Sequence, residues 1–186
     1  MTTRNLPSIE QTRALALSLH GPEYFGHLER VECYLLEFVA LLPEGLVSDE
    51  DVLVARHVAY LHDSIEDGYT TRAELEAQGY DDRILVRVEG LTRDPAKEVY
   101  QEKIEKIAAS GDVVLVLDKL ADNKDNSTKD RIVSMPPERW SLVKRYRRAR
   151  ATLHEGYRAI LLDQGMTAED IGPILAEMGA FDTGDY

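Results

Sequence analysis

Apolar residues recur at intervals of three and four positions along most of the chain, and no segment alternates apolar and polar residues as a half-buried strand does. The run 113–117 would suit a buried strand by composition alone, but helical spacing continues beyond it to Asp122, so we expect a helix there too. The longest apolar stripe belongs to a helix expected at about 23–42 and comprises Leu28, Val31, Leu35, Phe38, Val39 and Leu42. This pattern predicts an all-α fold.

Capping and breaking residues indicate where the helices begin and end. Ser8 and Gln11 have the spacing of a capping box, and Gly21-Pro22 interrupts the helix that follows. Asp94-Pro95 has the pattern of an N-cap followed by proline at the first helical position. Helices are expected at about 8–19, 23–42, 48–67, 72–78, 81–91 and 94–109, from 113 onward, from 136 to about 162, and after a cap at 167. The tail 181–186 is expected to fray.

The length of 186 residues suits one compact domain with a single core. No internal repeat, low-complexity segment or interdomain linker interrupts the chain. We therefore expect a single domain over 1–186, with its core at about 8–165 and a C-terminal helix and tail at 166–186.

Composition restricts where the protein works. No run approaches the roughly 18 apolar residues of a membrane span, and residues 1–13 lack the apolar stretch of a signal peptide. We therefore expect a cytoplasmic protein, in a cytosol of bacterial type, without a membrane partner. Cys33 is the only cysteine, which excludes an intramolecular disulfide, and its apolar neighbours predict a buried thiol.

The formal net charge is −12, which argues against nucleic acid as a partner because an acidic surface repels a phosphate backbone. A small phosphorylated substrate remains compatible with this charge, since a basic patch can lie beside carboxylates that surround a metal ion. Most of the excess charge has an ordinary explanation, which is that it keeps the protein soluble.

The first candidate site is the segment 62–67, where His62, Asp63, Glu66 and Asp67 would share one end of a helix. Carboxylates this close repel each other unless a cation lies among them. Imidazole with carboxylate is a suitable ligand set for manganese, iron, cobalt or zinc. The alternative is a solvated helix end without a ligand.

The second candidate site lies at 118–126, where Lys119, Asp122 and Asn126 form one stripe on a helix. Such a stripe could offer one metal ligand flanked by a cation and an amide that bind phosphate or sugar oxygens. An ordinary polar helix face is the alternative. Asp118 and Asp125 share a face with Asp122, so spacing leaves the choice of ligand open.

The order of these residues resembles that of the HD superfamily of metal-dependent phosphohydrolases. His27, the pair His62-Asp63 and Asp122 follow its H…HD…D order, and residues 24–31 resemble its "PYxxHPxxVA" opening. Residues 59–67 resemble "ALLHDxIEDT", and residues 119–126 resemble "KLADxxxN". Similarity of this kind covers about residues 13–153. The paired HD and ED and the KLAD segment resemble the RelA/SpoT-type alarmone hydrolase branch most.

This resemblance implies roles for ten residues. The ligands of one divalent metal ion, with Mn²⁺ favoured and Fe²⁺, Co²⁺, Zn²⁺ or Mg²⁺ as alternatives, would be His27, His62, Asp63 and Asp122. The pair that orients or deprotonates the attacking water would be Glu66 and Asp67. The substrate would be held by Lys119 and Asn126, with Arg93 and Tyr146 as phosphate and base or ribose contacts.

The resemblance also implies a small-molecule nucleotide as substrate, with a (p)ppGpp-like 3′-pyrophosphate favoured. A 5′-nucleotidase or nucleoside triphosphate hydrolase of the same fold, and a non-catalytic nucleotide sensor, are the alternatives. Alarmone hydrolases carry a longer, basic stretch before the "PY" segment, whereas this chain has only residues 20–23, with acidic Glu23. We therefore expect weaker binding of a nucleotide with a diphosphate at each end. A homo-oligomer is compatible with the sequence.

Overall fold

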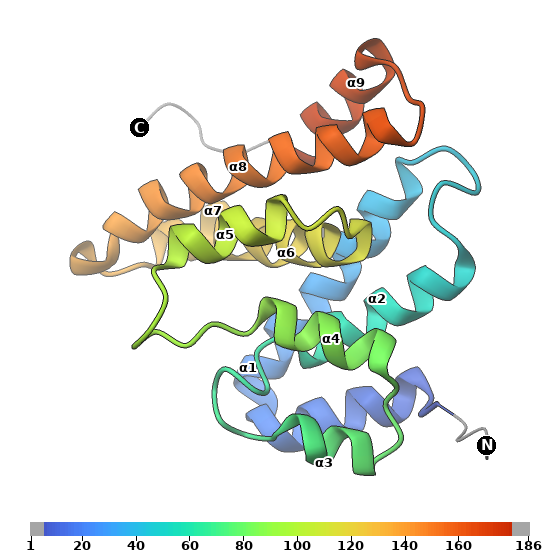
Figure 1. The fold of residues 1–186 in the computed structure, drawn as a ribbon. Coiled ribbons are helices and arrows are strands. Elements are labelled where there is room, and N and C mark those ends of the chain that lie inside the picture. The colour runs from blue at the N-terminus through green and yellow to red at the C-terminus, as the bar shows by residue number, and fades with distance from the viewer. Residues whose placement is uncertain (1–5, 180–186) are drawn as a thin grey trace.

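The computed structural model describes residues 6–179, and every regular element within this range is a helix (Figure 1). The helices are α1 (Ile9–Ala40), α2 (Asp49–Leu61), α3 (Arg72–Ala77), α4 (Asp82–Leu91), α5 (Tyr100–Ala108), α6 (Val113–Asn126), α7 (Lys129–Val133), α8 (Ser141–Asp163) and α9 (Ala168–Gly179), with one 3₁₀ turn, η1 (Pro137–Arg139). The predicted all-α class is confirmed. The tail 181–186, which we expected to fray, lies outside the described residues.

Helix α1 begins and bends where the sequence predicts. The Ser8 hydroxyl accepts a hydrogen bond from the Gln11 backbone N–H, and the Gln11 side chain accepts one from the Ser8 N–H, which completes the capping box. At Gly21 the backbone has φ 75°, a conformation that glycine adopts without steric cost, and Pro22 follows it. The bend separates two helical segments, and the second one carries His27.

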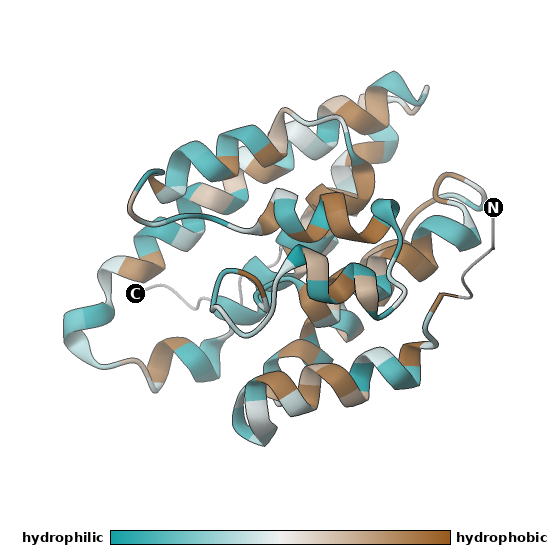
Figure 2. Ribbon diagram, turned by 60° about the horizontal axis from the view of Figure 1, so that its bottom comes forward, coloured by the Kyte–Doolittle hydropathy of each residue, from teal (hydrophilic) through white to brown (hydrophobic). Residues whose placement is uncertain are grey.

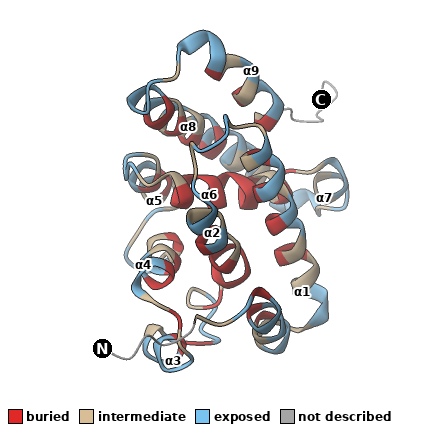
Figure 3. Ribbon diagram, turned by 90° about the vertical axis from the view of Figure 1, so that its right-hand side faces the viewer, coloured by how far each residue is buried: buried red, intermediate tan, exposed pale blue. Residues whose placement is uncertain are grey.

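Helix α6 lies at the centre of the molecule and is covered by α1, α2, α4, α5 and α8 (Figure 3). Its apolar residues at 114–117, 120 and 121 are all buried, so the expectation of a helix rather than a strand at 113–117 is confirmed. Apolar residues of the surrounding helices lie mainly on their inward faces (Figure 2). The central position of α6 brings polar residues of its C-terminal half into contact with α1 and α2.

Helix α2 ends earlier than predicted. We expected it to continue through Asp67, but it ends at Leu61, and 62–68 forms a series of turns. Both the backbone N–H and the hydroxyl of Ser64 donate to the Leu61 carbonyl, at 3.0 and 2.6 Å, which replaces the regular helical hydrogen bond. Gly68, with φ 75°, closes the turns. The acidic residues of this segment therefore diverge instead of lining one helix face.

The helix predicted from Asp94 was also wrong, since α5 begins only at Tyr100. The Asp94 side chain accepts from the Ala96 N–H, as an N-cap does, but the backbone forms a single turn in which Lys97 and Glu98 donate to the Asp94 carbonyl. A local cap signal thus produced a turn, which places 93–99 along the edge of the candidate site.

Two smaller expectations also need correction. Cys33 is exposed rather than buried, because its neighbours Val31, Glu32 and Leu35 occupy the inward face of α1. The long helix expected from Pro136 is preceded by the 3₁₀ turn η1 and starts as α8 at Ser141.

Asp118 is a buried carboxyl group in an environment that does not stabilise its charge. It is 2% exposed on α6, and neither carboxyl oxygen has a hydrogen-bond partner among residues 6–179. Burial raises the pKa of Asp118 well above 3.8, because the charged form loses its hydration. The folded protein therefore keeps this proton at pH values where the unfolded chain releases it.

This buried acid predicts a pH-dependent stability. Stability from protonated Asp118 is fully present below pH 3.8 and is lost as the pH rises toward the folded-state pKa, by about 1.4 kcal/mol per pH unit. Asp118→Asn cannot ionise, so relative to the wild type it should gain stability between pH 5 and pH 8. Urea unfolding at several pH values with a chelator present measures this difference. Parallel pH profiles for the two proteins would contradict it.

Candidate metal centre

Three ligand-type side chains from three elements converge beside the α6 helix. His27 on α1, His62 at the C-cap of α2 and Asp122 on α6 each present one nitrogen or oxygen, and these three atoms lie within 4.8 Å of one another. Nε2 of His27 and Nε2 of His62 lie 3.5 and 3.8 Å from Oδ1 of Asp122. All three residues are buried. The structure thus brings together three of the four ligands that the resemblance implies.

A backbone hydrogen bond orients the imidazole ring of His62 so that its second nitrogen faces the cluster. Its Nδ1 lies 2.9 Å from the Ala59 carbonyl oxygen, which only accepts hydrogen bonds, so Nδ1 carries the proton. Its Nε2 is buried and faces the two carboxylates, 3.0 Å from Oδ2 of Asp63 and 3.8 Å from Oδ1 of Asp122. A buried imidazole nitrogen of this kind is suited to binding a metal ion.

Asp122 is fixed by its own helix. Lys119 donates to Oδ2 at 2.7 Å, and the Asn126 amide donates to Oδ1. Burial by itself would raise the pKa of Asp122, but the charges of Lys119 and His62 outweigh burial and lower it. Asp122 is therefore ionised at neutral pH. The predicted stripe of Lys119, Asp122 and Asn126 is correct, and its two outer members bind the central carboxylate.

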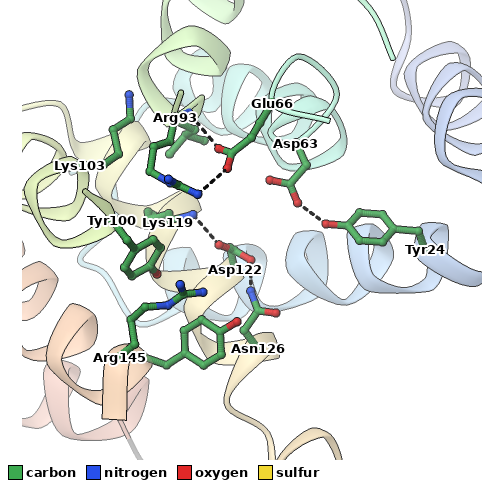
Figure 4. Close-up of a pocket in the computed structure, with 12 residues that line it drawn as sticks. Tyr24, Asp63, Glu66, Arg93, Tyr100, Lys103, Lys119, Asp122, Asn126 and Arg145 are labelled. Carbon is green, nitrogen blue, oxygen red and sulfur yellow. Dashed lines mark hydrogen bonds and ion pairs between the residues drawn. The ribbon is translucent and has the colours of Figure 1, made fainter. Parts of the chain in front are cut away.

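Asp63, the fourth expected ligand, lies at the edge of this group. Its Oδ2 is 3.0 Å from Nε2 of His62, and the same oxygen accepts a hydrogen bond from the Tyr24 hydroxyl (Figure 4). It is not one of the three residues whose ligand atoms lie within 4.8 Å of each other. Asp63 therefore faces the cluster from one side, oriented by an aromatic residue of α1.

The electrostatics of the cluster favour a cation. Burial disfavours the protonated form of His62, but the charges of Asp63 and Asp122 outweigh burial and raise its pKa to about 9. Two carboxylates thus draw a proton onto a buried imidazole, at the position where a divalent ion would balance the same charges. Two imidazoles and a carboxylate are also a chemically suitable ligand set. The residues present therefore fit a divalent metal ion.

The cluster borders a pocket of about 190 Å³. Figure 4 shows Asp63 and Asp122 at one side of this pocket and Tyr100 and Arg145 at the other. Seven of the ten residues singled out from the sequence line the pocket: Asp63, Glu66, Arg93, Lys119, Asp122, Asn126 and Tyr146. His27 and His62 are not among the residues that line the pocket.

Glu66 and Asp67 take different positions, although both were expected at one helix end with His62 and Asp63. Glu66 lines the pocket and accepts the Arg93 backbone N–H at 2.8 Å, with the Arg93 guanidinium 3.5 Å away. Asp67 is not among the pocket residues, and its carboxylate lies 3.9 Å from Nδ1 of His20. Burial and the nearby charges of Asp63 and Glu66 raise the pKa of Asp67.

Besides Tyr24 and Leu91, three pocket residues were not named as site residues from the sequence: Tyr100, Lys103 and Arg145. Arg145 lies over the Tyr100 ring, with its guanidinium carbon 4.4 Å from the ring centroid, and over the Tyr146 ring at 5.5 Å. Burial lowers the pKa of Lys103, a sign of its partly enclosed position. No local motif marks these residues, because they come from two separate helices, α5 and α8.

Within residues 6–179, no helix combines the length and apolar character needed to cross a membrane. Neither the known protein families nor the curated proteins contain a sequence match to this chain.

Proposed function

We propose that this protein is a metal-dependent phosphohydrolase that acts on a nucleotide. The observation that carries the proposal is the convergence of His27, His62 and Asp122 beside a pocket with cationic side chains on its wall. The resemblance to HD-type phosphohydrolases supports it, because the resemblance implies the same three residues as ligands independently of their proximity.

Different residues of the pocket would bind the substrate and accept the proton of the attacking water. When bound, a divalent ion makes water more acidic and offsets phosphate charge. Arg93, Lys103, Lys119 and Arg145 surround the pocket and would neutralise the phosphate group of the substrate. Glu66 lines the same pocket and would accept the proton of the attacking water or orient that water for in-line attack.

The aromatic residues of the pocket favour a nucleotide over a simple phosphate ester. Tyr100 and Tyr146 offer ring surfaces on which a base can stack, and Arg145 offers a flat cation beside them. The favoured reaction is release of pyrophosphate from a 3′-pyrophosphorylated alarmone, with Mn²⁺ as the favoured ion. A 5′-nucleotidase or nucleoside triphosphate hydrolase is the alternative reaction, and a nucleotide sensor is the alternative without catalysis.

A panel of nucleotides incubated with Mn²⁺ and analysed by chromatography tests the proposal. Pyrophosphate as product would support the alarmone reaction, orthophosphate a nucleotidase, and tripolyphosphate a triphosphohydrolase. Binding without turnover would support the sensor. A protein that neither binds nor hydrolyses any nucleotide in the panel would contradict the proposal.

Segment 20–23 is short and has no lysine or arginine that could bind a second phosphate group of the substrate. Binding of that group would therefore depend on Arg145. None of residues 20–23 lines the pocket. Of the cations that could substitute for a basic segment, Arg93 faces Glu66 and Lys97 pairs with Asp94 outside the pocket. Arg145 lines the pocket, and its guanidinium lies over the rings of Tyr100 and Tyr146.

Arg145→Gln is therefore expected to lower kcat/KM for guanosine tetraphosphate by about ten- to a hundredfold, the effect of one lost charge-assisted contact of about 1.5–3 kcal/mol. Hydrolysis of p-nitrophenyl phosphate should change much less. Arg148→Gln, an exposed position on the same helix outside the pocket, is the control. The wild type should either bind the tetraphosphate weakly or prefer a less phosphorylated nucleotide to it. A strong wild-type preference for the tetraphosphate that survives Arg145→Gln would show this interpretation to be wrong.

A further inference from the structure

His27 has a buried carboxylate behind it, on the side away from the cluster. Its Nδ1 lies 2.7 Å from Oδ2 of Asp125, a residue 98 positions further along the chain. Asp125 is completely buried. It also accepts a hydrogen bond at 2.6 Å from Nε of Arg30 and one at 2.5 Å from Nη1 of Arg131.

The chemistry of these groups fixes the position of the His27 proton. A carboxylate only accepts hydrogen bonds and a guanidinium only donates them. Nδ1 of His27 is 2.7 Å from the Asp125 oxygen and 3.2 Å from Nη1 of Arg131, so the proton on Nδ1 points to Asp125. The other nitrogen, Nε2, then presents its lone pair toward Asp122, which lies 3.5 Å away.

The arrangement follows from helix geometry. Residues three positions apart lie on one face of a helix, and both helices at this contact use that spacing. Helix α1 supplies His27 and Arg30, and α6 supplies Asp122 and Asp125. Each helix therefore presents one member of the cluster and one member of the network behind it. Arg131, on the short helix α7, adds the second cation.

The other two members of the cluster depend on neighbours close in sequence. His62 donates to the carbonyl of Ala59, three residues earlier, and Asp122 is held by Lys119 and Asn126. His27 is oriented through a contact between distant parts of the chain. Loss of that contact would leave its ring free to rotate or to carry its proton on Nε2, and either change removes a ligand.

We propose that Asp125, clamped by Arg30 and Arg131, is the positioning residue that holds His27 in its metal-binding orientation. This inference rests on the proposed function, because it assumes that the cluster binds a divalent ion. Outer hydrogen-bond partners of this kind typically contribute 10- to 100-fold to metal affinity. Burial by itself would raise the pKa of Asp125, but the hydrogen bonds from His27, Arg30 and Arg131 lower it.

The test compares three variants by Mn²⁺ titration in a calorimeter and by the Co²⁺ absorption spectrum. Asp125→Ala removes the acceptor, and its metal affinity should fall 10- to 100-fold. Asp125→Asn keeps an oxygen that can accept from His27, so its loss should be smaller. Glu32→Ala is the matched control. Glu32, on α1, is also a buried carboxylate, but Arg56 and Tyr60 donate to it and no member of the cluster does.

A merely structural role would lower the melting temperature of Asp125→Ala and Glu32→Ala alike and leave metal affinity unchanged in both, which would overturn the proposal. If Asp125→Ala does not fold, Asp125→Asn decides, and wild-type affinity together with an unchanged Co²⁺ spectrum would overturn it. Absence of metal binding by the wild-type protein would overturn the proposed metal centre itself. Wild-type binding with unaltered affinity in the Asp125 variants would overturn only this inference.

Discussion

Replacing His62 with alanine is expected to abolish metal retention and hydrolysis together. Its Nε2 atom is buried and lies 3.0 Å from Oδ2 of Asp63 and 3.8 Å from Oδ1 of Asp122, and alanine offers no ligand atom in its place. Asp63→Ala is expected to have the same effect, because its carboxylate lies 3.0 Å from that nitrogen. Elemental analysis of the purified variants measures metal content.

The fold should survive these changes, since an ion at the edge of a pocket contributes less to stability than the apolar core does. His57→Ala is a suitable control. His57 is a buried histidine on the same helix, but it lies 2.8 Å from the Thr12 hydroxyl, away from the cluster. This variant should lose stability and keep its metal. Adding a chelator should lower the melting temperature of the wild type and of His57→Ala, but not that of His62→Ala. Undiminished metal in both His62→Ala and Asp63→Ala would refute the ligand assignment.

Glu66→Gln is expected to keep the metal and to lower turnover by about a hundredfold or more, the usual effect of removing a general base. The amide oxygen of glutamine can still accept the Arg93 backbone N–H, so the loop at 92–99 should keep its position. Asp67→Asn should act in the same direction if Asp67 shares the proton transfer. Steady-state kinetics on the best substrate, with metal content measured in parallel, separate chemistry from binding.

Glu89→Gln controls for the loss of a surface ion pair, because Glu89 pairs with Arg72 on the exterior. The structure distinguishes the two candidate bases by position: Glu66 lines the pocket, whereas Asp67 lies beside His20 and not among the pocket residues. A larger effect of Glu66→Gln than of Asp67→Asn is therefore expected. Unchanged turnover in both variants would assign the pair a structural role.

Local sequence signals determined most of the helices and part of the site. The capping box at Ser8, the break at Gly21 and the stripe of Lys119, Asp122 and Asn126 depend on residues no more than seven positions apart. Interactions over such distances are set by helix geometry alone. For the same reason the apolar spacing around α6 was sufficient to predict a helix at 113–117, and this prediction is confirmed.

Where local signals competed with packing, the tertiary structure decided the outcome. Asp94 caps a turn rather than a helix, and α2 ends at Leu61 because Ser64 binds the helix's last carbonyl group. Cys33 lies in an apolar segment, yet it is exposed because α1 presents its opposite face to the core. Each local pattern admitted two conformations, and the burial of neighbouring residues selected one.

The contacts that complete the site could not be derived from sequence spacing. Asp125 meets His27 across 98 residues, and the guanidinium of Arg145 on α8 lies over the ring of Tyr100 on α5. The sequence by itself determined which residues could act as ligands, acids and cations, since that follows from side-chain chemistry. Only the packing of α1, α2 and α8 around α6 decided which of them meet, because long-range contacts depend on how whole helix faces bury their apolar area.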